Sequence, residues 1–156
     1  MGIFAGKKGL ILGVANDRSI AWAIAEEVLA GGGKCGFTHL PDKPDDQRRK
    51  NQRRVAKLTD EHDGACFLMP MDVQQDDDIR AVVGRAVEEF GEIDFILHSI
   101  AFATLDDLRR DTVETSRDGF KLAMEISAYS LIAVANAAKD HMSGNSSIVT
   151  MTYFGG

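Results

Sequence analysis

The chain has 156 residues, of which 44% are hydrophobic, 27% are charged and only three are proline. This composition predicts one soluble globular domain spanning residues 1–156 and excludes a disordered or fibrous chain. A net charge of −6 gives no reason to expect a nucleic acid or an anionic membrane surface as a partner. Since no apolar run has the length of a signal peptide or a membrane span, we expect a cytoplasmic protein.

Short apolar runs alternate with helix-like stretches along the chain. The predicted strands cover residues 9–12, 34–39, 65–69, 93–97 and 146–152. The predicted helices cover residues 20–30, 45–60, 76–90 and 113–141, with an irregular stretch at 98–111 and a turn at 143–145. This alternation predicts the α/β class, as a Rossmann-type doubly wound parallel sheet that is truncated after its fifth strand.

Two further features bear on the core. The predicted long helix is apolar nearly all round over residues 131–138, so we expect it to be buried on more than one side, with Tyr129 in the core or in a subunit contact. Cys35 and Cys66 lie in predicted strands and lack the paired spacing of a metal or redox site. We therefore expect buried, reduced thiols and no metal site.

A turn joins the first predicted strand to the first predicted helix over residues 13–19. Gly13 allows a tight turn with close backbone approach, and Ser19 is a candidate N-cap whose hydroxyl could also reach a phosphate oxygen. Because a helix start presents free N–H groups and the positive end of the helix dipole, this turn suits a pyrophosphate. The usual G-x-G-x-x-G spacing is absent, however, and an ordinary strand-to-helix turn remains an alternative.

Ligands of open α/β sheets bind beyond the carboxyl ends of the strands, which makes three further strand ends candidates. Leu40 closes the second strand, Asp72 the third and Ser99 the fourth. Asp72 could equally be an N-cap for the following helix. We interpret His98 as a strand-end residue that fills space beside the ligand rather than as an acid or base, because no carboxylate is adjacent in sequence.

Several motifs together resemble the bacterial enoyl-acyl carrier protein reductases, divergent members of the short-chain dehydrogenase/reductase superfamily. The motifs are Gly13-Val14-Ala15, Ser19-Ile20-Ala21-Trp22, Phe37-Thr38, Met71-Asp72-Val73, His98-Ser99-Ile100-Ala101-Phe102-Ala103, Gly119-Phe120-Lys121 and Ile126-Ser127-Ala128-Tyr129-Ser130. The resemblance implies NADH-dependent reduction of the trans-2 double bond of an acyl chain on acyl carrier protein. It also implies a homotetramer in the full-length form.

The same resemblance assigns roles to individual residues. For the cofactor they are Gly13, Ser19 and Ile20 at the pyrophosphate, Leu40, Asp72 and Val73 at the adenosine, and Ser99, Ile100 and Ala101 toward the nicotinamide ribose. Ala103 matches a substrate contact, and Tyr153 matches the first of two active-site tyrosines. The second tyrosine and a lysine would follow later, so the 156-residue chain is expected to lack much of the stabilisation of the enolate oxygen and to be inactive.

The sequence departs from this pattern at the second strand end. Leu40 stands where many relatives carry Gln and cannot hydrogen-bond a ribose hydroxyl. Asp42 follows two residues later, and an acid there would oppose a 2′-phosphate, which favours NADH over NADPH. The basic run over residues 48–54 is interpreted as a solvated face, with docking of the acidic carrier protein as the alternative.

Two other functions remain open. One is another short-chain dehydrogenase such as a ketoreductase, although His98-Ser99-Ile100 stands where its usual members carry Asn-Ala-Gly. The other is a short, non-catalytic nucleotide-binding module.

Overall fold

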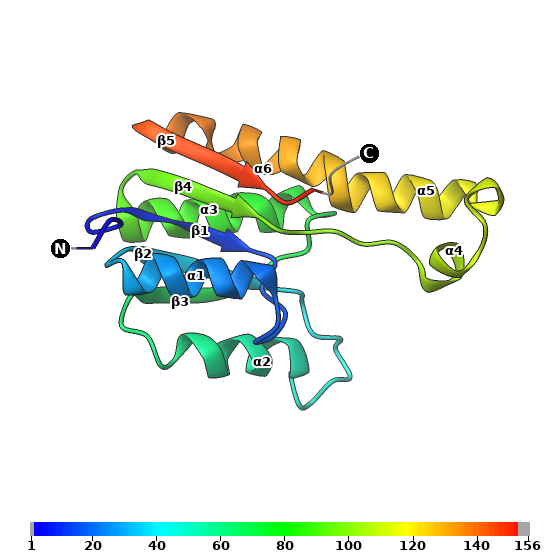
Figure 1. Cartoon of the computed structure of the whole chain (residues 1–156), viewed down its shortest axis with the longest axis horizontal. Coiled ribbons are helices and arrows are strands. Elements are labelled where there is room, and N and C mark those ends of the chain that lie inside the picture. The colour runs from blue at the N-terminus through cyan, green and yellow to red at the C-terminus, as the bar shows by residue number, and fades with distance from the viewer. Residues whose placement is uncertain (1, 153–156) are drawn as a thin grey trace.

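The computed structural model describes residues 2–152 and contains one parallel sheet with the strand order β3-β2-β1-β4-β5 (Figure 1). Helices lie on both faces of this sheet, which confirms the predicted Rossmann-type class. The strands are β1 (Lys8–Leu12), β2 (Lys34–His39), β3 (Ala65–Pro70), β4 (Ile93–His98) and β5 (Met142–Thr150). The helices are α1 (Ile20–Ala30), α2 (Lys50–Thr59), α3 (Asp76–Phe90), α4 (Leu105–Arg109), α5 (Arg117–Met124) and α6 (Ser130–Ala138), with short 3-10 turns at Thr112–Glu114 and Lys139–His141.

The central strands bury side chains on both faces of the sheet. In β1, Leu10 and Leu12 point into a core shared with α3 and α6, whereas Ile11 points into a second core shared with α1 and α2. All three are at most 1% exposed, and burial of one such side chain contributes about 1.5 to 3 kcal/mol. A continuous apolar run therefore identifies a strand covered by helices on each side.

The second helix begins five residues later than predicted. Asp42 accepts the backbone N–H groups of Asn51 and Gln52, at 2.6 and 3.1 Å, and so satisfies the first turn of α2 from outside the helix. Asp46 accepts the N–H groups of Arg48 in the preceding turn and of Lys50, the first residue of α2. These two carboxylates explain why the first part of the predicted helix is a loop.

The predicted irregular stretch and the predicted long helix are both divided differently in the structure. Thr104 caps the short helix α4, and Ser116 caps α5 by accepting the N–H of Gly119 at 3.0 Å. Asp107 accepts both the N–H and the hydroxyl of Ser116, which fixes the start of α5 four residues after the predicted one. Between α5 and α6 the chain makes one π-helical segment, Glu125–Tyr129.

The expectation that residues 131–138 are buried on more than one side is wrong for the single chain. A single stripe of α6, formed by Ser130, Val134 and Ala138, is buried against the sheet. Ile132 is 63% exposed and Tyr129 is 54% exposed, so Tyr129 does not belong to the core. The i, i+4, i+8 spacing of the buried stripe shows that one face of the helix packs on this chain.

The predicted turn at residues 143–145 lies inside β5. Ile93 pairs with Met142 and Phe95 with Ser147, so the register between β4 and β5 shifts over these few residues. The polar residues that suggest a turn therefore form an irregularity at the edge of the sheet.

The two cysteines differ in burial. Cys35 is fully buried, and burial raises the pKa of its thiol to about 12, which keeps it protonated. Cys66 is only partly buried, and both thiols are free. The prediction of buried, reduced thiols is confirmed for Cys35 and holds in part for Cys66.

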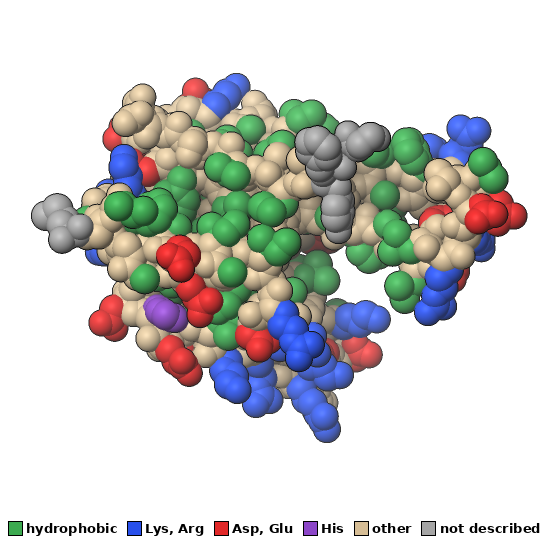
Figure 2. Space-filling model, in the orientation of Figure 1, with side chains coloured by type: hydrophobic (Ala, Val, Ile, Leu, Met, Phe, Trp, Pro, Cys, Tyr) green, Lys and Arg blue, Asp and Glu red, His purple; other side chains and the backbone are tan. Residues whose placement is uncertain are grey.

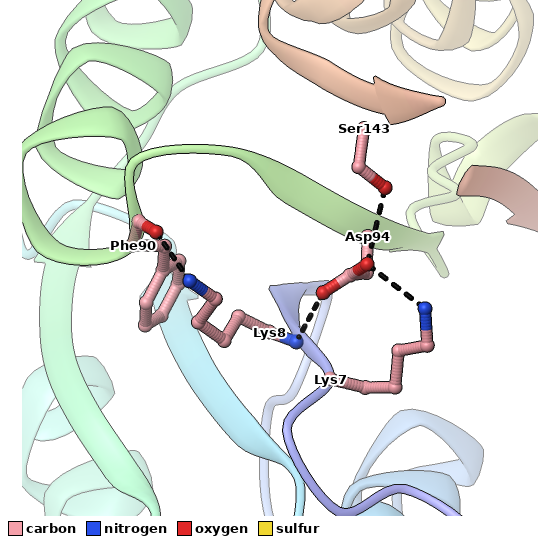
Figure 3. A network of polar contacts seen from close by, with 5 residues as sticks. All are labelled: Lys7, Lys8, Phe90, Asp94 and Ser143. Carbon is pink, nitrogen blue, oxygen red and sulfur yellow. Dashed lines mark hydrogen bonds and ion pairs between the residues drawn. The ribbon is translucent and has the colours of Figure 1, made fainter. Parts of the chain in front are cut away.

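A polar network joins the starts of three strands at the end of the sheet where β1 begins (Figure 3). The Asp94 carboxylate accepts hydrogen bonds from Lys7 Nζ at 3.0 Å, from the Lys8 N–H at 3.0 Å and from Ser143 Oγ at 3.1 Å. Lys8 Nζ in turn donates to the carbonyl of Phe90 at the end of α3. One carboxylate thus connects the first residues of β1, β4 and β5.

We expect Asp94→Asn to lower the free energy of unfolding by about 1 to 2 kcal/mol at pH 7, since charge-assisted hydrogen bonds are lost. Partial burial opposes the charge of Asp94, but the bonds from Lys7, Lys8 and Ser143 outweigh it and lower its pKa. Its contribution is therefore present above the unfolded pKa of about 3.9 and is lost as the pH falls through the folded value. Denaturant titrations at pH 7 and pH 3 should show the difference between the two proteins shrinking at pH 3.

Asp63→Asn serves as the control, because Asp63 is exposed and makes no side-chain hydrogen bond within residues 2–152. It makes the same change in charge and should alter stability by less than about 0.5 kcal/mol. Equal effects of the two substitutions would show that the network contributes nothing beyond net charge.

Candidate functional site

A groove of about 480 Å³ lies at the carboxyl ends of β1 to β4. Seven of the predicted site residues line it, from four different strand ends: Gly13, Leu40, Asp72, Val73, Ser99, Ile100 and Ala101. The molecule is hollowed between α2 and the lobe that carries α4 and α5 (Figure 2). The structure therefore brings together positions that are up to 88 residues apart in the chain.

Three other predicted residues do not line the groove. Ser19 and Ile20 lie at the start of α1, next to the turn that enters it, and Ile20 is 60% exposed. Ala103 is half-buried beyond the lining residue Phe102. Tyr153 lies outside the described residues.

Gly13 follows the last residue of β1 and lies against Ser99, which follows the last residue of β4. Its φ is +103°, and a Cβ there would meet the carbonyl oxygen of Ser99. The N–H of Ser99 also donates to the carbonyl of Leu12 at 3.0 Å, which continues the pairing of the two strands. Only glycine satisfies both the backbone conformation and the close approach.

The structure confirms Ser19 as the N-cap residue of α1, although its side chain makes no capping hydrogen bond to the helix. Its hydroxyl oxygen instead accepts the N–H groups of Ala15 and Asn16, at 3.0 and 3.1 Å. The hydroxyl thus fixes the shape of the turn that follows Gly13. Because the Ser19 side chain makes no hydrogen bond to the first turn of α1, the N–H groups at that helix start remain available to an anion.

Asp72 is a lining residue and not the N-cap of α3, a position that Gln75 occupies. Its Oδ1 accepts the N–H of Gln74 at 3.0 Å, and its own N–H donates to Asp78 Oδ2 at 2.9 Å. These bonds hold the loop after β3 in place. The alternative interpretation of Asp72 as a helix cap is therefore wrong.

Ser127 of the π-helical segment and Ser130, the first residue of α6, bond to the last residue of β4 and to the loop after it. Ser127 Oγ accepts the N–H of Phe102 at 3.0 Å and donates to its carbonyl at 3.2 Å. Ser130 Oγ donates to the carbonyl of Ile126 at 2.6 Å and lies 2.7 Å from His98 Nε2. Both serines belong to the Ser-x-x-Ser motif of the sequence and hold one wall of the groove.

His98 is 1% exposed and does not line the groove. It is buried behind the lining residues and does not lie beside a ligand, in contrast to the prediction from the sequence. Because the Ser130 hydroxyl donates to Ile126, it must accept from His98, which places the imidazole proton on Nε2. Nδ1 then accepts from Thr150 Oγ1, 3.2 Å away. Burial lowers the pKa of His98, and the neutral ring satisfies both hydrogen bonds.

Helical residues also line the groove, and none of them was among the predicted site residues. Asn51, Arg54 and Val55 of α2 line the end next to Leu40, and Leu122 and Ile126 line the opposite wall. The spacing of the three α2 residues places them on one helical face, which is a signal that the sequence does contain.

No group of three or more His, Cys, Asp or Glu side chains among residues 2–152 is arranged to hold a metal ion. In that same part of the chain no helix combines the length and apolar character needed to cross a bilayer.

The strand order, the glycine turn into α1 and the groove at the carboxyl edge define a Rossmann-type nucleotide-binding protein. A known protein family narrows this class further. The profile of the family described as enoyl-(acyl carrier protein) reductase matches residues 13–156. The chain therefore belongs to the enoyl-(acyl carrier protein) reductase family.

Individual relatives agree with this assignment. The chain is 40% identical to the NADH enoyl-[acyl-carrier-protein] reductase FabI of Nostoc sp. over 97% of its own length and 57% of that protein. It is 41% identical to FabI of Bacillus cereus over 100% of its length and 59% of that protein. The chain thus spans less than three fifths of the length of these curated relatives.

Solved structures show the same partial match. The reductase of Aquifex aeolicus superposes with a TM-score of 0.88 at 38% identity, covering 97% of this chain and 57% of the other. The Bacillus cereus enzyme with NADP+ and an indole naphthyridinone superposes with a TM-score of 0.88 at 41% identity, covering 98% and 57%.

Proposed function

We propose that this chain forms the dinucleotide-binding part of an enoyl-acyl carrier protein reductase that uses NADH to reduce the trans-2 double bond of its carrier-bound substrate. The groove at the ends of β1 to β4, closed by Gly13 against Ser99, carries the proposal. Membership of the family supports the choice of this reaction. We also propose that the protein is cytoplasmic.

The residues of the groove suit the parts of a dinucleotide. Gly13 lets the pyrophosphate approach the backbone, and the turn held by Ser19 directs the start of α1, including Ile20, toward the phosphate charge. Leu40, Asp72 and Val73 face the adenosine, whereas Ser99, Ile100 and Ala101 face the nicotinamide ribose. When bound, the dinucleotide supplies the hydride.

Two further residues are proposed on the substrate side. Ala103 follows Phe102, whose backbone Ser127 holds, and this neighbourhood supports a contact between Ala103 and the substrate. Tyr153 is proposed to donate a hydrogen bond to the enolate oxygen that forms as the hydride arrives.

We also propose that the protein assembles as a homotetramer. The exposed apolar residues of α5 and α6, among them Phe120, Met124 and Ile132, are 49% to 63% exposed on the single chain. Monomers rarely leave large apolar side chains of neighbouring turns uncovered, so a second copy suits this surface.

The proposed function is tested by measuring NADH fluorescence and NADH oxidation with an enoyl thioester. The purified 156-residue chain should bind NADH without turnover. A chimera that joins it to the remaining part of the Nostoc reductase should oxidise NADH with the enoyl thioester and not with a 3-ketoacyl thioester.

The outcomes separate the candidate functions. A chimera that prefers the 3-ketoacyl substrate would replace the proposal by a ketoreductase. Binding of NADH without turnover by a folded chimera would instead favour a non-catalytic nucleotide-binding module. Turnover by the 156-residue chain alone would refute the expectation that it is inactive.

A further inference from the structure

We propose that Arg54 binds the 2′-phosphate of the adenosine ribose, so that the groove accepts NADPH in addition to NADH. The inference rests on the proposed function, since it concerns the adenosine end of the same site. It assigns a specificity role to a residue of α2 that lies fifteen positions after His39, the last residue of β2.

Arg54 lies at the end of the groove where an adenosine ribose would face α2. Asn51, Arg54 and Val55 share one face of this helix and line the groove together with Leu40. Val55 is only 1% exposed, so the helix is anchored on the core beneath β2. The backbone that carries Arg54 is therefore held in place beside the groove.

The guanidinium of Arg54 is available to an anion. Its side chain is exposed and forms no ion pair within residues 2–152. Residues 42–54 contain six Lys or Arg against three Asp, although the whole chain carries a net charge of −6. The blue side chains over α2 and its preceding loop gather at this end of the molecule (Figure 2).

Asp42, the acid expected to oppose a 2′-phosphate, binds the start of α2 instead. Both oxygens of Asp42 accept backbone N–H groups of α2, and those of Asp46 accept the N–H groups of Arg48 and Lys50. Burial raises the pKa of Asp42, but the N–H groups of Asn51 and Gln52 lower it by more. Its charge is thus compensated by the helix start, and its oxygens are directed at the backbone.

The end of β2 also lacks the residue that excludes a 2′-phosphate in NAD-specific proteins. Such proteins carry an Asp or Glu that binds the ribose 2′-hydroxyl, whereas an Arg nearby accommodates the phosphate. Here His39 and Leu40 end the strand, and His39 Nδ1 is engaged with the carbonyl of Leu40 at 2.9 Å. Among the lining residues from β2 and α2 the charged side chain is the cation Arg54, whereas Asp72 lines the groove from the loop after β3.

The experiment compares adenosine 2′,5′-bisphosphate with 5′-AMP, which differ only in the 2′-phosphate. Isothermal titration of the 156-residue chain should show the bisphosphate binding about tenfold more tightly at low salt, because a guanidinium and a phosphate form paired hydrogen bonds. Salt should reduce this ratio, because the guanidinium is exposed. NADH and NADPH should both displace the bound nucleotide.

Three variants test the assignment. Arg54→Ala should reduce the ratio to about one while leaving the affinity for 5′-AMP within about twofold, and Arg54→Lys should keep part of the ratio. Arg53→Ala is the matched control, since Arg53 is exposed on the same helix but does not line the groove. It should keep the ratio of the unaltered chain.

Other results would overturn the inference without touching the proposed function. A ratio of one in the unaltered chain, or an equal loss of both nucleotides in Arg54→Ala, would show that Arg54 does not bind the 2′-phosphate. Equal effects of the Arg53 and Arg54 variants would show only a diffuse charge effect and would overturn it as well. Failure of NADH and 5′-AMP to bind the unaltered, folded chain would instead refute the proposed dinucleotide site itself.

Discussion

Gly13→Ala is expected to lower the free energy of unfolding by about 2 to 5 kcal/mol and to weaken NADH binding about tenfold or more. A φ of +103° costs a residue with a Cβ about 1 to 2 kcal/mol. The new methyl group would also meet the carbonyl of Ser99, and displacing packed atoms costs about 1 to 3 kcal/mol. Since the turn must then move, the pyrophosphate loses its close approach to the backbone. Denaturant titration and NADH fluorescence measure the two effects.

Gly6→Ala provides the control for backbone conformation alone. Gly6 also has a positive φ, +80°, but a Cβ there would meet no atom within 4 Å. This substitution should cost about 1 to 2 kcal/mol and leave NADH binding unchanged. If both glycine variants cost the same and bind NADH equally, the approach of Gly13 to Ser99 is not what requires glycine.

Ser130→Ala is expected to lower the free energy of unfolding by about 1 to 3 kcal/mol. The Ser130 hydroxyl is the acceptor for the Nε2–H of His98, and both residues are at most 1% exposed. Without it a buried donor remains unsatisfied, which costs more than the loss of an exposed hydrogen bond. Thermal or denaturant unfolding of the purified variant measures the cost.

Ser127→Ala, three residues earlier in the π-helical segment, is the matched control. Ser127 bonds the backbone of Phe102, which is exposed, so water can replace the lost hydroxyl. Ser127→Ala should lower the free energy of unfolding by less than about 1 kcal/mol. The loss in the free energy of NADH binding should be larger than this loss of stability. A larger loss of stability in Ser127→Ala than in Ser130→Ala would contradict the assignment of the two serines.

Much of the sheet could be predicted because the signal is local. The apolar run around Ile11 and the helix from Ile20 to Ala30 follow from composition and spacing alone, and their boundaries agree with the structure within a residue. The start of α2 could not be predicted, because the carboxylate that accepts the N–H of Asn51 comes from Asp42, nine residues before Asn51. Asp107 fixes the start of α5 in the same non-local manner.

The groove shows a similar division. The strand ends at Gly13, Asp72 and Ser99 could be assigned to one site because parallel strands end at one edge of a sheet. Arg54 could not, because a basic run on a polar helix is usually solvated and its distance from the groove depends on packing. Ser19 is the predicted N-cap, but its hydroxyl accepts N–H groups of the preceding turn and not of the helix.

The network around Asp94 lies at the opposite end of β1 from Gly13. At about 3.3 Å per residue, Lys8 and Leu12 are roughly 13 Å apart, which exceeds the range over which substitutions usually influence one another. The energetic costs of changes at the two ends should therefore add. Stabilising substitutions around the starts of the strands can compensate for costly ones at the groove while leaving its affinity for a nucleotide as it is.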